Sequence, residues 1–181
     1  SLAFSPDGKL LAVGLGRQQT GRVLVLPTEG TDVSPIREFD TGTNSVRSVA
    51  FSGDGRLLAA GADRPTAPEH ARSSVPMWQV ADGSQVGSPG HPASAIGEVQ
   101  RVALSLDGRL VAYAGEGGVF LGQRDGNLFA QRLSDVNARG VVIASVARVR
   151  LLVVVMRASK TEGRASRTSL SEYWTRLFEG R

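Results

Sequence analysis

A twelve-residue pattern occurs three times in the chain, and this repetition constrains the fold more than any other feature of the sequence. The copies begin at Ser1, Ser48 and Arg101, so the distances between them are 47 and 53 residues. Each copy has alternating apolar residues, then a Ser-x-Asp-Gly-Lys/Arg segment, then a run of apolar residues. Self-similarity at a spacing of this order is typical of architectures in which each repeat is one supersecondary unit.

Each copy predicts a β-hairpin. Apolar residues alternate before the turn, as Leu2 and Phe4 do, which is the pattern of a strand. The turn contains an Asp-Gly dipeptide in every copy, and glycine accepts the positive φ that a tight turn requires. The strand after the turn is apolar at nearly every position, as in residues 10–13. Such a strand is buried on both faces, so we expect further sheets above and below it.

Each predicted hairpin is followed by a third strand, at residues 22–26, 75–80 and 119–123. A weaker fourth strand is predicted at residues 35–39 and 127–133, whereas the Gly-, Ser- and Pro-rich segment 83–97 predicts mostly loop. Four antiparallel strands in each unit of about 40–50 residues are the signature of a β-propeller blade. The sequence therefore predicts an all-β chain of three four-stranded propeller blades.

The sequence resembles the WD-repeat β-propellers over residues 1–133. Residues 46–59 read Val-x-x-Val-Ala-Phe-Ser-x-Asp-Gly-Arg-Leu-Leu-Ala, and residues 75–83 read Val-Pro-Met-Trp-Gln-Val-Ala-Asp-Gly. Gly90-His91 stands near the place of the family's Gly-His dipeptide. The blades depart from the family in that only one of them has the tryptophan, Trp78, and none has Trp-Asp. The resemblance implies a scaffold that binds other proteins and has no catalytic activity.

The last quarter of the chain predicts two further parts. Residues 134–168 contain a possible decayed fourth blade, without the Asp-Gly turn, followed by a basic loop; the alternative is that no fourth hairpin forms. Residues 169–179 predict a short amphipathic helix, which we expect to pack as a cap on the last sheet. A docking helix for a partner is the alternative. The apolar face of this helix consists of Leu170, Tyr173, Trp174, Leu177 and Phe178.

Three blades and a possible fourth are too few to close a ring, so we expect a fragment of a longer propeller protein of bacterial type, or a degenerate propeller. The chain begins inside the first copy of the pattern, which suggests that the start of the protein is missing. No stretch reaches the ~20 apolar residues of a membrane span. We expect a cytoplasmic protein and no membrane partner.

The composition excludes several kinds of chemistry. The chain has no cysteine, so it cannot form disulfides, thiolate metal sites or a cysteine nucleophile. It has two histidines, and the glycines between Gly14 and Gly21 lack the spacing of a phosphate-binding loop. Residues 1–133 carry 12 Lys and Arg against 13 Asp and Glu, and this near-neutral body predicts no nucleic-acid surface. We therefore expect no cofactor, no metal and no catalytic residue.

Partner contacts are predicted in the loops that join the second and third strands of the first two blades, because binding residues often lie on loops of a rigid scaffold. The second of these loops is long for a hairpin, and excess length is often functional. Two other functions remain open: a sensory or regulatory module of a larger signalling protein, and a propeller enzyme with a site in the central channel. The predicted protein-binding residues are Arg17, Gln18, Gln19, Arg64, Glu69, His70 and Arg72.

Overall fold

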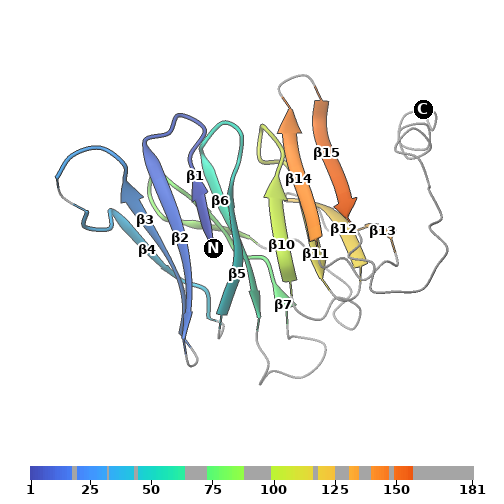
Figure 1. The fold of residues 1–181 in the computed structure, drawn as a ribbon, viewed down its shortest axis with the longest axis horizontal. Coiled ribbons are helices and arrows are strands. Elements are labelled where there is room, and N and C mark those ends of the chain that lie inside the picture. The colour runs from blue at the N-terminus through green and yellow to red at the C-terminus, as the bar shows by residue number, and fades with distance from the viewer. Residues whose placement is uncertain are drawn as a thin grey trace.

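The structure is a computed structural model that describes residues 1–17, 20–31, 33–42, 45–63, 73–87, 99–115, 118–124, 131–134, 140–146 and 149–156. Every element in these residues is a β-strand, and the strands form successive antiparallel sheets (Figure 1). The all-β prediction is therefore confirmed for the described part of the chain. The helix predicted at residues 169–179 lies outside the described residues and stays a prediction.

The first two sheets are the blades predicted from the first two copies of the pattern. Blade 1 has the strand order β1-β2-β3-β4, and blade 2 has the order β5-β6-β8-β9, with the short strand β7 also paired to β6. The strands of blade 1 are β1 (Leu2–Phe4), β2 (Leu10–Arg17), β3 (Thr20–Pro27) and β4 (Arg37–Asp40). Those of blade 2 are β5 (Ser45–Phe51), β6 (Leu57–Asp63), β7 (Ser73–Ser74), β8 (Met77–Gln79) and β9 (Gln85–Gly87).

The third sheet repeats this arrangement, and a shorter sheet follows it. Blade 3 has the strand order β10-β11-β12-β13, and the last two strands form an antiparallel hairpin. This hairpin is a fourth, two-stranded unit within residues 134–168, where the sequence left open whether a fourth hairpin forms. Its strand β14 lies beside β10. The strands are β10 (Val99–Leu104), β11 (Leu110–Gly115), β12 (Gly118–Gln123), β13 (Gln131–Ser134), β14 (Gly140–Val146) and β15 (Val149–Met156).

Two details of blade 2 differ from the prediction. Residues 75–80 do not form one continuous strand, because β8 begins only at Met77, after Pro76. Proline has no backbone N–H to donate, which explains the interruption of the ladder at this position. Residues 85–87 form the fourth strand, β9, in a segment predicted as mostly loop. The three residues Gln-Val-Gly contain a single apolar side chain, too little for an alternation to be recognised in the sequence.

The three predicted turns are tight hairpin turns with glycine at positive φ. The φ angles of Gly8, Gly55 and Gly108 are 73°, 71° and 65°. In the first turn the Ser5 hydroxyl donates to the Asp7 carboxylate at 2.6 Å and accepts from the Leu10 N–H at 2.9 Å. Serine and aspartate make the same contacts in the turns of blades 2 and 3. The repeated Ser-x-Asp-Gly segment is thus one turn structure, used three times.

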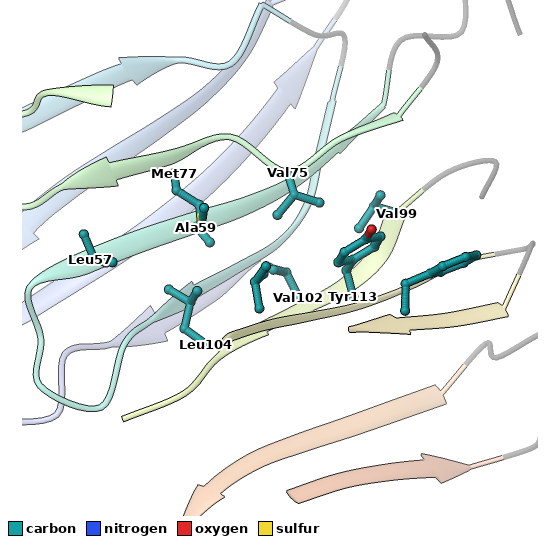
Figure 2. Packing of buried hydrophobic residues seen from close by; sticks show 10 residues of the cluster. Leu57, Ala59, Val75, Met77, Val99, Val102, Leu104 and Tyr113 are labelled. Atoms are coloured by element: carbon teal, nitrogen blue, oxygen red, sulfur yellow. The ribbon is translucent and has the colours of Figure 1, made fainter. Parts of the chain in front are cut away.

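The blades stack face against face, and the second strand of blade 2 is buried on both sides. Leu57, Leu58 and Ala59 have exposed fractions of 4%, 0% and 0%. We call the face of each blade that points to the preceding blade its leading face, and the opposite face its trailing face. Leu58 and Trp78 lie on the leading face of blade 2 and pack on blade 1. Leu57, Ala59, Val75 and Met77 lie on its trailing face and meet Val99, Val102, Leu104 and Tyr113 of blade 3 (Figure 2).

Candidate functional site

The two loops predicted to bind a partner begin at the ends of equivalent strands. In blade 1, β2 ends at Arg17, which pairs with Thr20, so only Gln18 and Gln19 lie between the paired strands. In blade 2, Asp63 at the end of β6 pairs with Ser73, and these two residues therefore enclose a loop of residues 64–72. The structure thus shows a tight hairpin in blade 1 and a long connection in blade 2.

Both loops leave the sheets at the same end of the molecule. A Cβ atom placed on Gly16 would lie 2.6 Å from the Cα atom of Ser45, so the end of β2 touches the start of β5. Ser45 in turn pairs with Asp63. The strand ends that carry the two loops are therefore neighbours, and blade stacking holds them together. We call the predicted binding region, residues 17–19 and 64–72, the loop face.

The predicted contact residues themselves lie mostly outside the described part of the chain. Only the backbone of Arg17 is described, as the last residue of β2. The binding role of this set stays a prediction. Its members outside the described residues are Gln18, Gln19, Arg64, Glu69, His70 and Arg72.

Contacts between the blades hold the first strands of successive blades together. The Ser1 hydroxyl oxygen accepts a hydrogen bond from the Val49 N–H, and the Ser48 hydroxyl oxygen accepts one from the Val102 N–H, both at 3.1 Å. The first strand of one blade is thus tied to the first strand of the next, twice in the same way. Ser48 and Val102 are both buried, so losing the bond would leave the Val102 N–H without an acceptor, which is costly.

The outer parts of blades 1 and 2 are joined as well. Phe39 of β4 stacks on Trp78 of β8, with ring centroids 4.8 Å apart and an angle of 20° between the ring planes. The Arg37 guanidinium donates a hydrogen bond of 2.6 Å to the Ala81 carbonyl oxygen. A continuous apolar core and these edge contacts make blades 1 and 2 one packed unit, on which a loop can be held without its own secondary structure.

At the opposite end of the blades lie the three Asp-Gly turns, with two shallow hollows around the turn of blade 2. One hollow of about 380 Å³ is lined by residues of the first two turns, including Asp7, Leu10 and Asp54. The other, of about 480 Å³, lies between Asp54, Arg56 and the end of β8 at Gln79. The sequence did not predict these hollows, although the repeated Ser-x-Asp-Gly turns that border them are its clearest pattern.

The aspartates of these turns are occupied in holding the backbone. The hydrogen bond from the Ser5 hydroxyl, and then that from the Lys9 N–H, lower the pKa of Asp7 below its ordinary value. The pKa of Asp107 is lowered in the same way by the Ser105 hydroxyl and the Arg109 N–H. A carboxylate that accepts such bonds is stabilised in its charged form, and the same bonds hold the backbone of the turn. The described residues contain no group of three or more His, Asp or Glu that could hold a metal ion.

Comparison with known proteins identifies the repeat. The family described as WD domain, G-beta repeat (WD40) matches residues 33–64, which include β4, β5 and β6. The chain contains a WD repeat. The WD match begins before the outer strand of blade 1 and continues through the first two strands of blade 2, so the sequence repeat joins two neighbouring blades. No curated protein matches the chain.

Solved structures show the propeller fold. The β-propeller domain of Cps50 (Swd1) from Myceliophteria thermophila has a TM-score of 0.53 at 19% identity and covers 69% of this chain. Hydrazine synthase from Kuenenia stuttgartiensis has a TM-score of 0.57 at 16% identity and covers 77% of this chain. The matches cover 35% and 37% of those two chains, so this chain spans about a third of their length. At such identities the likeness concerns the fold alone.

No helix in the part of the chain that the structure describes is long and apolar enough to cross a membrane.

Proposed function

We propose that this WD-repeat chain is a non-catalytic platform that binds another protein through its loop face. The observation that carries the proposal is the close approach of Gly16 to Ser45 and the pairing of Ser45 with Asp63, which makes neighbours of the strand ends that lead into the two loops. A packed scaffold that holds loops side by side is how many binding proteins present their contact residues. WD repeats and the propeller fold support the same function.

The charges on the loop face indicate what kind of partner it binds. The seven predicted contact residues include three arginines, one glutamate, one histidine and two glutamines. A surface of this composition forms hydrogen bonds and ion pairs with both acidic and polar groups, and arginine is enriched at protein interfaces. A near-neutral body favours a protein over a nucleic acid, because phosphate binding relies on a basic surface.

The test replaces the loop and leaves the blades intact. A variant in which residues 65–72 are exchanged for a short Gly-Ser linker should keep its unfolding midpoint, because the pairing of Asp63 with Ser73 remains. Cross-linking followed by mass spectrometry first identifies the partner and the chain residues that contact it. The dissociation constant of that partner should then rise at least about tenfold in the loop variant, as expected for removal of a main contact region.

The matched control changes the opposite end of the blades. Lys9 and Arg109 are exposed residues beside the turns, so the double substitution to alanine should leave both stability and affinity unchanged. Equal binding by the loop variant and the wild-type chain, or loss of binding only in the control, would show that the loop face is not the binding surface.

A further inference from the structure

The Asp-Gly turns of the three blades, which we number 1 to 3 after their blades, are not equally close to one another. Turn 3 packs tightly on blade 2, because a Cβ atom on Gly108 would lie 2.5 Å from Leu57 Cδ1, and Leu57 is 4% exposed. At the equivalent place in turn 2, a Cβ atom on Gly55 would have only Pro6 Cδ within 4 Å, at 3.5 Å. Leu10, the counterpart of Leu57, is only half-buried. Turns 1 and 2 therefore stand apart where turns 2 and 3 are in contact.

Backbone hydrogen bonding differs between the two pairs of turns in the same way. The Asp54 N–H of turn 2 donates to the Leu106 carbonyl oxygen of turn 3 at 2.8 Å. Its counterpart in turn 1, the Asp7 N–H, makes no such bond to the Gly53 carbonyl oxygen in the described residues. Leu106 packs on Gly53, whereas Gly53 has no side chain that could reach turn 1. The hollow of about 380 Å³ between turns 1 and 2 is thus a place that is filled between turns 2 and 3.

The lining of this hollow defines what it can bind. Pro6 and Leu10 supply apolar surface, and Asp7 offers its backbone N–H as a hydrogen-bond donor. Asp7 and Asp54 supply one carboxylate from each turn, and none of the described lysines and arginines lines the hollow. The hydrogen bonds that hold each turn go to Oδ1 of its aspartate, so Oδ2 can face a cation. The chemistry fits an apolar side chain next to a positive charge.

We propose that the gap between turns 1 and 2 binds a leucine side chain of a partner protein, presented on an extended segment with a lysine or arginine beside it. The leucine packs against turn 2 from the side of turn 1, as Leu106 packs against it from the side of turn 3. A carbonyl oxygen of the partner accepts from the Asp7 N–H, and the basic side chain pairs with Asp7 or Asp54, which fixes the orientation of the segment. The hollow lies at the opposite end of the blades from the loop face, so this proposal and the proposed function can fail separately.

The test uses the 181-residue chain and the peptide acetyl-Ala-Leu-Arg-Ala-amide as the probe. Nuclear magnetic resonance titration should show saturable shifts of the Gly53 and Gly55 amide signals, because both residues line the hollow. Alanine in place of the leucine of the peptide should weaken binding about tenfold, since the buried apolar area is lost. Absence of saturable shifts at these two amides, or equal affinities of the leucine and alanine peptides, would overturn the proposal.

Two glycines at the same turn position give a matched pair of variants. Gly55→Asn should fold, because asparagine tolerates positive φ and its Cβ atom would meet Pro6 Cδ at an ordinary distance of 3.5 Å. Its side chain would occupy the hollow, so affinity for the peptide should fall at least about tenfold. Gly8→Asn changes a glycine that does not line the hollow and has nothing within 4 Å of its Cβ position, so affinity should stay the same. Equal affinities of the two variants would contradict the proposal.

The role of charge is tested separately. Asp7→Asn keeps the acceptor oxygen of the turn and removes the charge, so affinity for the peptide should fall about two- to fivefold, as for the loss of an exposed ion pair. Asp107→Asn makes the same change in turn 3, which does not line the hollow, and should have no effect. Equal effects of the two substitutions would show non-specific attraction and overturn the proposal. Gly53 and Gly55 signals that shift with protein concentration alone would show that a second copy fills the gap, which also contradicts it.

Discussion

At the scale of single residues, the Asp-Gly turns are the best-defined feature of the chain. Gly55 has a φ of 71°, a conformation that β-branched residues rarely adopt. Gly55→Val should therefore lower the free energy of unfolding by about 1–2 kcal/mol. Chemical denaturation measures the change, and Gly55→Asn is the matched control, because asparagine tolerates positive φ. Equal effects of valine and asparagine would show that the backbone conformation is not the cause.

The turn aspartates make stability depend on pH in a defined direction. The pKa of Asp107 is lowered from 3.8 in the folded chain, so the ionised form favours folding. This contribution is present above the ordinary pKa of aspartate and is lost as the pH falls through the lower, folded value. Nuclear magnetic resonance titration should show the pKa of Asp107 below 3.8, and Ser105→Ala should raise it towards that value. An Asp107 pKa that Ser105→Ala leaves unchanged would contradict the hydrogen bond.

Local sequence predicted these turns because all of their contacts lie within five residues. The Ser5, Asp7 and Leu10 contacts can be anticipated from the repeated Ser-x-Asp-Gly segment alone. The hydrogen bond from the Val102 N–H to Ser48 joins residues that are 54 positions apart. Such a bond depends on how blades stack, so the sequence gives no local sign of it.

At the scale of elements, the stacked rings of Phe39 and Trp78 connect β4 of blade 1 with β8 of blade 2. Both side chains are buried, and truncation of a buried Phe or Trp to alanine usually costs about 3–5 kcal/mol. A double-mutant cycle with Phe39→Ala and Trp78→Ala should give a coupling free energy of about 0.5–1.5 kcal/mol. Val33→Ala, at a position that is 76% exposed, is the control and should change stability by less than about 0.5 kcal/mol. Strictly additive effects of the two truncations would mean that the rings do not interact.

Strand boundaries were predictable where apolar alternation is long, and less so elsewhere. The hairpins β1-β2, β5-β6 and β10-β11 follow directly from the repeated pattern. The short β9 was missed, because its pairing with β8 and not its own residues defines it. The burial of a strand likewise depends on its neighbours: β2 and β6 both begin Leu-Leu-Ala, but Leu11 of β2 is only half-buried whereas its counterpart Leu58 of β6 is buried.

At the scale of the whole molecule, the repeat predicted three blades of propeller type, and the structure and the solved propellers confirm them. The loop face could be predicted only as a set of residue ranges, since the contact between Gly16 and Ser45 depends on blade packing. The exposure of Leu2 and Phe4 on the leading face of blade 1 could likewise not be read from the sequence, because it depends on the register of β1 and β2 and on blade packing.

Successive WD-type blades stack in one repeated geometry, in which the first strand of each blade is hydrogen-bonded to the first strand of the next. Hydrogen exchange in Ser48→Ala tests it most directly, with Ser1→Ala as the reciprocal variant. Loss of the Ser48 hydroxyl should speed exchange of the Val102 amide about three- to tenfold, the equivalent of one hydrogen bond, and leave Val49 unchanged. Ser1→Ala should do the opposite, speeding Val49 and sparing Val102. Exchange at Val102 that does not respond to Ser48→Ala would contradict the stacking of blade 2 on blade 3.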